Sequence, residues 1–169
     1  MSEKFTLFYG GYFSQWYRSS PDQFVIDGVT YNCAEQFMMA EKARLFGDKE
    51  SLERIMRENH PKDQKAIGRQ VKDFNVEKWD AISRNCVYLG NYAKFTQNKG
   101  LLLELMSTEG TTLVEASPTD RIWGIRRSMD DPLAYDKNQW LGKNWLGQVL
   151  TKLRDNIKLG IERVETDWE

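Results

Sequence analysis

Apolar and polar residues of this chain follow a strand-like pattern near residue 24 and a helical pattern soon afterwards. The run FVIDGVTY, from Phe24 to Tyr31, places Asp27-Gly28 between two β-rich segments, which is typical of a tight hairpin turn. In the next stretch, YNCAEQFMMAEKARLFGD, apolar residues recur at helical spacing, and Gly47 suits the end of a helix. The pattern therefore predicts a hairpin followed by a helix, with an apolar stripe at Ala34, Phe37, Met38 and Leu45.

The middle of the chain has the spacing of consecutive helices. Lys49–Arg57 predicts a short helix, and Pro61 suits the first position of the next one. Two further helices are predicted over Val76–Phe95 and Lys99–Met106, on either side of a QNKG break. The longer of the two has its apolar stripe at Trp79, Ile82, Cys86, Leu89 and Ala93.

Strand-like and loop-like segments flank this helical middle. Phe5–Tyr9 predicts a strand, Phe13–Gln23 a loop, and Thr111–Ser117 alternates like a half-buried strand. A polar loop, SPTDRIWGIRRSMDDP, follows this strand. Asn144 is placed to cap a final amphipathic helix, and the charged tail is expected to fray from Lys158. These elements predict an α+β fold that is mostly helical and has a small β-sheet.

Length and composition narrow the class of protein. At 169 residues the chain is predicted to form a single compact domain, residues 1–169, that buries about 70% of its unfolded surface. Its 24 Lys and Arg balance 25 Asp and Glu, so no global positive field draws it to nucleic acid or membranes. Cys33, Cys86 and a single histidine predict neither a disulfide framework nor a metal cluster. Without a signal-peptide pattern or a membrane-spanning run, we expect a soluble, cytoplasmic protein.

The acidic residue at the start of the predicted helix, Glu35, has two interpretations. Asn32 suits the N-cap, and Glu35 can reach back to the N–H of Asn32 in a capping box. The position also suits a catalytic carboxylate, because a helix N-terminus keeps a nearby carboxylate ionised. Spacing alone favours capping and leaves catalysis open.

The other polar and aromatic candidates are also ambiguous from pattern alone. Asp120 suits an Asx turn, and Glu115 on the predicted strand would face solvent. Trp123 beside Gly124 could stack on a base, but a tryptophan after a strand is more often core, and Trp79 has the same alternatives. The sequence lacks the serine hydrolase, P-loop, dinucleotide-binding and zincin motifs.

Several stretches together resemble one known family, the NADAR family, also called YbiA-like. The match covers most of the chain and keeps the order of the family's sequence blocks. One departure is Arg126, which stands where the family often has a second glycine after WGI, and it bears on the shape of that loop. The matching blocks are FSQWY at Phe13, IDGVTYNCAEQFMMAEKARLFGD at Ile26, AIGRQV at Ala66, Trp79, YAKFTQN at Tyr92, LVEASPTDRIWGI at Leu113 and LGKNWLGQVLTKLR at Leu141.

The resemblance implies an α+β fold and an N-glycosidase without metal or organic cofactor. Its expected substrates are phosphorylated ribosides of riboflavin synthesis, or ADP-ribose attached to guanine, alone or within nucleic acid. Glu35 matches the family's signature glutamate and Asp120 the acidic residue before its WG pair, so these are the candidate catalytic residues. The candidate substrate-binding residues are Lys42, Arg69, Trp79, Lys94, Trp123, Gly124 and Asn144.

The chemistry of such a reaction suits these residue types. Cleavage of the bond passes through an oxocarbenium-like sugar, which a carboxylate stabilises while a base activates water. Basic side chains can neutralise a phosphate, and an aromatic plane can hold the departing base. Two other functions stay open: a module that binds ADP-ribose without cutting it, and a structural or interaction protein that keeps only the fold. Turnover would separate the enzyme from the binding module.

Overall fold

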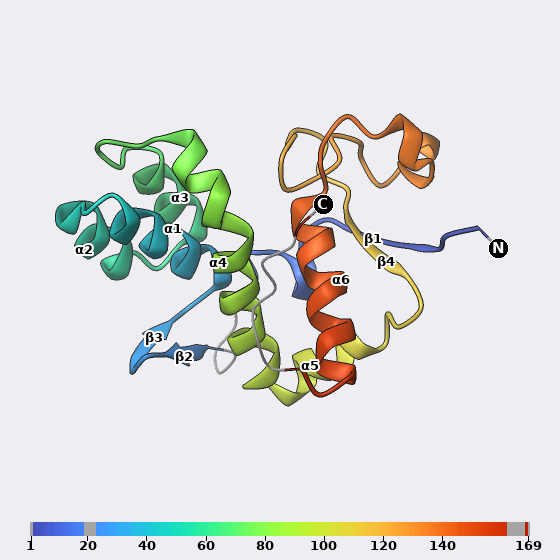
Figure 1. Ribbon diagram of the computed structural model, residues 1–169, viewed down its shortest axis with the longest axis horizontal. Coiled ribbons are helices and arrows are strands. Elements are labelled where there is room, and N and C mark those ends of the chain that lie inside the picture. Colours follow the sequence, from blue (N-terminus) through green and yellow to red (C-terminus); the bar gives the residue numbers. More distant parts are fainter. Residues whose placement is uncertain (1, 19–22, 162–167, 169) are drawn as a thin grey trace. The chain divides into compact units, whose positions relative to one another are not determined.

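The computed structural model describes residues 2–18, 23–161 and 168, so part of the predicted loop at 13–23 and most of the tail beyond 158 lie outside the described residues. The chain divides into two compact units. Met1–Ser14 and Gly100–Arg163 form the first unit, and Gln15–Lys99 with Val164–Glu169 form the second. Both helices and strands are present, which confirms the α+β class (Figure 1).

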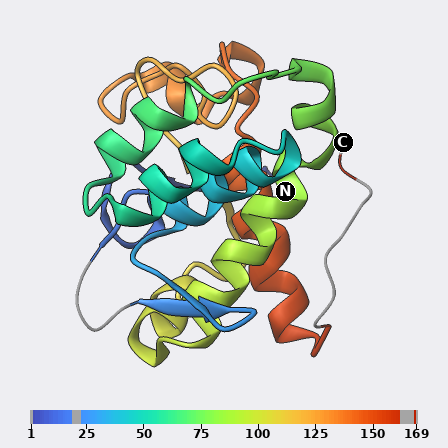
Figure 2. The same cartoon turned by 90° about the vertical axis from the view of Figure 1, so that its left-hand side faces the viewer.

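The second unit is built from a hairpin and a group of helices. The hairpin pairs β2 (Phe24–Ile26) with β3 (Val29–Tyr31) in antiparallel register. Asp27 and Gly28 both have positive φ, 51° and 77°, as the predicted tight turn requires. The hairpin lies along the C-terminal half of the longest helix (Figure 2). The helices are α1 (Ala34–Leu45), α2 (Lys49–Arg57), α3 (Pro61–Gly68) and α4 (Val76–Thr96).

Helix α1 is the centre of this unit, because it packs against α2, α3 and α4 at once. Two glycines permit this close approach. A Cβ at Gly68 of α3 would clash with the Met39 side chain, and a Cβ at Gly90 of α4 would lie 2.9 Å from the Phe37 ring. Burial on several sides explains why α1 shows no single apolar stripe. The prediction that Leu45 belongs to such a stripe is wrong, because the side chain of Leu45 is exposed. Leu89 of α4 is exposed for a similar reason, because α1 covers another face of that helix.

The first unit combines a parallel strand pair with a long helix. Strand β1 (Phe5–Phe8) pairs with β4 (Thr112–Glu115), and α6 (Trp145–Lys158) packs against β4. Helix α5 (Lys99–Met106) leads into this unit, and short 3-10 helices occupy Gly11–Phe13, Pro132–Tyr135 and Lys137–Gln139. Its core includes a buried cluster of Val114, Ala116, Ile125 and Ala134.

Strand β4 departs from the predicted alternation. Leu113 and Val114 are adjacent and both buried, and Glu115 is only partly exposed rather than turned fully to solvent. The reason is that β4 has cover on both faces: α6 packs on the strand, and the Val114 cluster lies beside it. Strand-like alternation fits one-sided burial, which this strand does not have.

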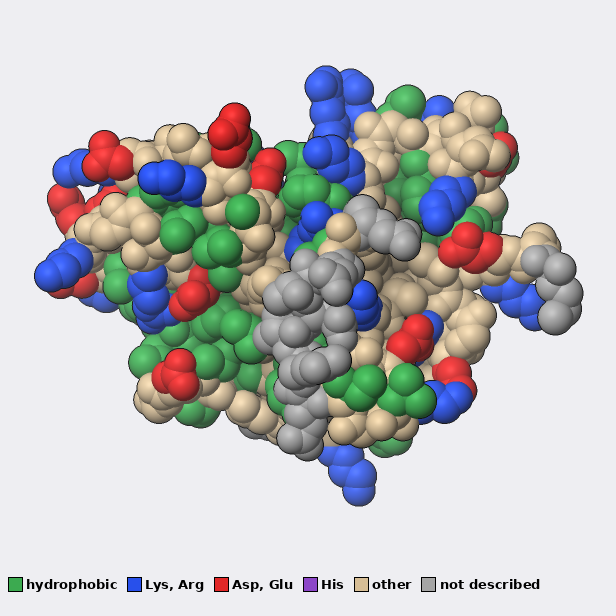
Figure 3. All heavy atoms as spheres, viewed as in Figure 1, with side chains coloured by type: hydrophobic (Ala, Val, Ile, Leu, Met, Phe, Trp, Pro, Cys, Tyr) green, Lys and Arg blue, Asp and Glu red, His purple; other side chains and the backbone are tan. Residues whose placement is uncertain are grey.

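Surface charge follows the balanced composition. On the face drawn in Figure 3, basic side chains are interspersed with acidic ones. In the part of the chain that the structure describes, no helix has the length and apolar character needed to cross a membrane.

Candidate active site

The N-terminus of α1 places Glu35 in the first helical turn, with a side chain that is only 5% exposed. The predicted capping box is wrong. Cys33 is the N-cap, and its Sγ accepts from the N–H of Gln36 at 3.4 Å. Gln36, not Glu35, reaches back, since its Oε1 accepts from the N–H of Asn32 at 2.8 Å. The N-cap is therefore Cys33, one residue later than the predicted Asn32. The N–H of Asn32 bonds to Gln36 and not to the carboxylate of Glu35.

A segment that precedes the hairpin fixes the backbone of Glu35. The N–H of Glu35 donates to the carbonyl of Gln15 at 2.9 Å. The buried side chain of Gln15 accepts from Asn91 Nδ2 of α4 at 2.7 Å and also contacts Met38 of α1. The FSQWY segment thus joins the start of α1 to α4. Sequence reasoning missed the part played by Gln15 and Asn91, although it singled out FSQWY as a loop.

Two basic residues lie along the same side of α1 as Glu35. Lys42 is seven positions further along α1, on the face that also carries Met39. Burial lowers the pKa of Lys42; the carboxylate of Glu35 opposes this shift, and the charge of Arg69 adds to it. Arg69 follows directly after Gly68, whose close approach to Met39 brings this end of α3 to α1. The fold therefore brings Glu35 and Arg69 each within electrostatic range of Lys42.

Lys94 of α4 is almost fully buried, at 1% exposure, in an aromatic environment. Its Nζ lies 5.4 Å from the ring centroid of Tyr17 and 4.8 Å from that of Phe95. Burial raises the pKa of the Cys33 thiol to about 11; Glu35 adds to this shift, whereas Lys94 opposes it. Cys33 therefore lies within the electrostatic range of both Glu35 and Lys94. It is not a reactive thiolate at neutral pH.

Trp79 lies in the first turn of α4 and is 6% exposed, so most of its ring is covered within the described structure. It belongs to the second unit, together with Glu35, Lys42, Arg69 and Lys94. The remaining candidates, Asp120, Trp123, Gly124 and Asn144, belong to the first unit.

Asp120 shapes the loop after β4. Its Oδ1 accepts from the N–H of Ile122 at 2.9 Å and from that of Trp123 at 2.8 Å, which confirms the predicted Asx turn. Gly124 packs so tightly that a Cβ would lie 2.9 Å from Ser117 Cβ and 3.0 Å from the Glu115 carbonyl. The loop has a defined shape that requires glycine at this position.

The ring of Trp123 is partly exposed at this loop. It meets Trp145 edge to face, with ring centroids 5.6 Å apart. The carbonyl of Trp123 accepts from the N–H of Leu146 at the start of α6. The beginning of α6 therefore holds Trp123 from both its ring and its backbone.

Asn144 occupies the predicted cap position before α6 but does not cap with its side chain. Its backbone is left-handed, at φ 53° and ψ 39°. The side chain points to β4 instead, where Oδ1 accepts from the N–H of Glu115 at 2.9 Å and Nδ2 donates to the Leu113 carbonyl at 3.0 Å. The amide of Asn144 thus pairs with β4 as a neighbouring strand would, which helix-start patterns cannot indicate.

Arg126, where the sequence departs from the resembled family, also has a left-handed backbone, at φ 55°. An arginine therefore adopts the conformation that glycine favours at this point of the loop. Its exposed side chain contrasts with that of Arg127, whose Nη1 lies 3.2 Å from Asp131 Oδ2. Among the described residues, no three His, Cys, Asp or Glu side chains form a metal-binding group.

Comparisons with known proteins point to one family. The model of the NADAR domain family matches residues 7–158. N-glycosidase R617 of Acanthamoeba polyphaga mimivirus is 38% identical over 164 residues, which cover 91% of this chain and 96% of that protein. The chloroplastic riboflavin biosynthesis protein PYRR of Arabidopsis thaliana is 30% identical over 125 residues, 72% of this chain but 18% of that protein.

A solved structure shares the fold. The NMR structure of YbiA from E. coli matches with a TM-score of 0.74 and 26% sequence identity. The match covers 95% of this chain and 88% of that chain.

Proposed function

Because this chain belongs to the NADAR domain family, we propose that it is an N-glycosidase that hydrolyses the bond between a ribose and the nitrogen of a base. The substrate is a phosphorylated riboside or an ADP-ribosyl adduct on guanine. The support is the 38% identity to N-glycosidase R617 across 91% of the chain. The geometric observation that carries the proposal is a buried carboxylate, Glu35, with the cations Lys42 and Arg69 along one side of its helix.

The reaction breaks the bond from the ribose anomeric carbon to the base nitrogen and adds water. The water oxygen joins the anomeric carbon, one proton of the water goes to the departing base, and the other remains on the new hydroxyl. Glu35 acts as the general base for that water or stabilises the oxocarbenium-like sugar. Asp120 is the second candidate carboxylate, although one of its oxygens already holds the Asx turn.

The other residues bind the substrate. Lys42 and Arg69 neutralise phosphate, so that the binding energy of this group positions the sugar. Lys94 contributes a further positive charge near the start of α1. In the second unit, Trp79 is the candidate contact for the departing base. In the first unit, Trp123 is the candidate contact, and Gly124 and Asn144 set the shape of the loop that carries it.

The test uses two substrate classes and one isosteric variant. Wild-type protein is incubated with ADP-ribosylated guanosine or DNA and, separately, with aminopyrimidine phosphoribosides, and free base is measured. Glu35→Gln should lower turnover of the active class by at least about 100-fold, because general base catalysis contributes roughly 10²- to 10⁴-fold. Substrate affinity should be largely kept.

Glu41→Gln is the matched control on the same helix. Glu41 pairs with Arg44 at 2.7 Å on the partly exposed side of α1, so its loss should leave turnover unchanged. Melting temperatures show that both variants are folded. If Glu35→Gln keeps activity within about tenfold of wild type, Glu35 is not the base and Asp120 becomes the candidate. If wild type binds ADP-ribose but releases no base from either class, the protein is a binding module.

A further inference from the structure

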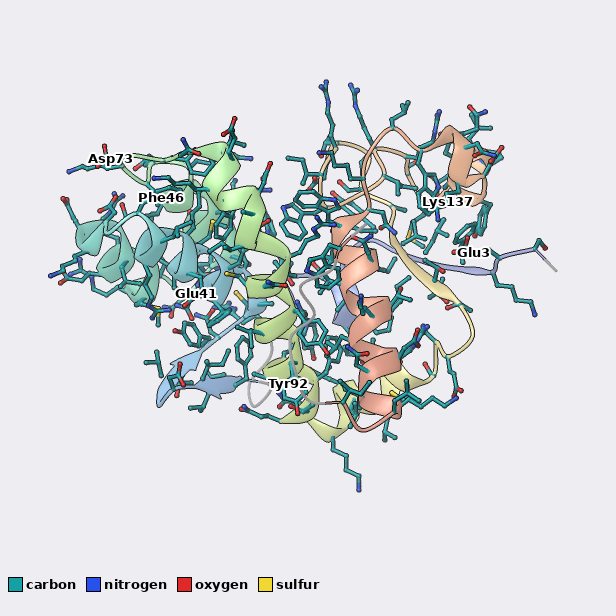
Figure 4. All side chains as sticks on the ribbon, viewed as in Figure 1. Glu3, Glu41, Phe46, Asp73, Tyr92 and Lys137 are labelled. Atoms are coloured by element: carbon teal, nitrogen blue, oxygen red, sulfur yellow. The ribbon has the colours of Figure 1, made fainter. Side chains whose placement is uncertain are left out.

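An aromatic pair, of which Phe74 is exposed and Phe46 partly buried, lies at the C-terminal end of α1. Phe46 directly follows the helix, and its ring centroid is 5.5 Å from that of Phe74, with the rings tilted by 60°. Phe74 is 44% exposed, so part of its ring faces solvent. Figure 4 labels Phe46 and Asp73, the residue before Phe74, and they lie close together. The left-handed backbone of Asp73, at φ 60°, turns the chain just before this ring.

The same aromatic pair adjoins the cations of the candidate site. Lys42 Nζ lies 4.5 Å from the centroid of Phe74. Arg69 is exposed, and its charge acts on Lys42. Among the described residues, neither of these side chains forms an ion pair. Two cations next to each other without paired carboxylates are typical of a surface that binds an anion.

These groups follow one another along α1. With a rise of ~1.5 Å per residue, Lys42 lies about 10 Å beyond Glu35 along the helix axis, and Phe46 about 6 Å further on. The order is therefore carboxylate, cations, aromatic surface. A ribose with a single phosphate has reacting and anionic groups but nothing that would reach the aromatic surface.

We infer that Phe74, supported by Phe46, is a stacking subsite for a second planar base that a diphosphate joins to the ribose under attack. The subsite rests on the proposed function and refines it, because it selects nucleoside diphosphate-linked ribose over singly phosphorylated ribosides. The scissile ribosyl group lies at Glu35, the diphosphate at Lys42 and Arg69, and the distal base on the exposed face of Phe74. A base that stacks there displaces water from an apolar ring and keeps its polar edge in solvent.

The test measures binding by calorimetry and requires no turnover. ADP-ribose, which carries both the diphosphate and the distal base, and ribose 5-phosphate, which lacks that base, are titrated into wild-type protein. Phe74→Leu keeps apolar bulk but removes the aromatic face, and it should weaken ADP-ribose binding roughly 5- to 150-fold. Binding of ribose 5-phosphate should not change. Phe74→Trp keeps a stacking face and should bind ADP-ribose at least as tightly as wild type.

Two further variants separate stacking from charge. Arg69→Ala should weaken the binding of both ligands, and this loss of affinity should shrink as the salt concentration is raised. Lys99→Ala removes an exposed cation at the first residue of α5, beyond the C-terminal end of α4, and should change the binding of neither ligand. Similar melting temperatures are expected for Phe74→Leu and wild type, because the Phe74 side chain is exposed.

The outcomes distinguish this subsite from the proposed activity. There is no stacking subsite if Phe74→Leu binds ADP-ribose within about twofold of the wild-type affinity. The same holds if Phe74→Leu lowers the affinity for ribose 5-phosphate as much as the affinity for ADP-ribose. Absence of measurable ADP-ribose binding by wild type would also overturn it. If the predicted binding pattern is found but no base is released from any substrate, the subsite stands and the N-glycosidase proposal fails.

Discussion

Replacing Asn144 tests how a side chain can substitute for a β-strand. Asn144→Ala removes two hydrogen bonds, one to the N–H of Glu115 and one to the carbonyl of Leu113. Each backbone group left without a partner costs about 1–3 kcal/mol, depending on how deeply it is buried. The left-handed backbone adds about 1 kcal/mol, since alanine disfavours the φ of 53° found here. We therefore expect Asn144→Ala to lower the free energy of unfolding by about 3–7 kcal/mol.

Two companion variants divide this loss into its parts. Asn144→Gly loses the same hydrogen bonds but tolerates the left-handed backbone, so it should be more stable than Asn144→Ala by about 1 kcal/mol. Asn144→Asp keeps the acceptor for Glu115 but places a carboxylate oxygen against the Leu113 carbonyl. Its instability should be relieved as pH falls, because the protonated carboxyl can donate to that carbonyl.

The assay is urea unfolding followed by two spectroscopic probes, since coincident transitions justify a two-state analysis. Variants are compared through the unfolding midpoint at constant slope. If Asn144→Ala stays within about 1 kcal/mol of wild type with an unchanged slope, the hydrogen bonds from Asn144 to β4 contribute little to stability, contrary to this prediction.

Two further predictions concern a strained turn and a helix cap. Arg126→Gly should raise the free energy of unfolding by about 0.5–1 kcal/mol, as thermal melts can show, because glycine accepts the φ of 55° without steric cost. If Arg126 also binds an anionic substrate, KM should rise in the same variant and the difference should shrink at high salt; an unchanged KM contradicts that contact. Hydrogen bonds from the N–H of Lys72 and from Ser51 lower the pKa of Asp48 to about 2. The ionised Asp48 carboxylate therefore stabilises the folded protein above pH ~4, and this stabilisation is lost as the pH falls toward 2. Asp48→Asn should therefore be less stable at neutral pH and fall less steeply in that window, measured by denaturation midpoints; parallel pH profiles would contradict this.

The sequence predicted most helices correctly because their spacing reflects burial on one side. Lys49–Arg57 and Lys99–Met106 match the observed helices at both ends, and Pro61 opens α3 as expected. The errors fall where tertiary contacts override local preference. Asn32 is a better N-cap by type than Cys33, but its side chain donates to the carbonyl of Glu58 instead.

The spacing of residues in the sequence predicts only part of the candidate site. Glu35 and Lys42 lie two turns apart on one helix, so their common side follows from helical periodicity. Arg69 comes within electrostatic range of Lys42 because Gly68 lets α3 approach Met39, a contact that no local pattern encodes. Phe74 was missed because it is an isolated aromatic residue in a polar turn. Only the folded chain shows that Phe46 and Lys42 adjoin it.

The structure also changes the balance between the two interpretations of Glu35. The capping interpretation required its carboxylate at the N–H of Asn32, but Gln36 occupies that N–H and Cys33 caps the helix. The cap of α1 therefore does not account for the glutamate at this position. Burying a carboxylate to 5% exposure is costly, and such groups persist where neighbouring charges or chemistry require them. Lys42 on the same side supplies one such charge, which agrees with the role proposed for Glu35 in the reaction.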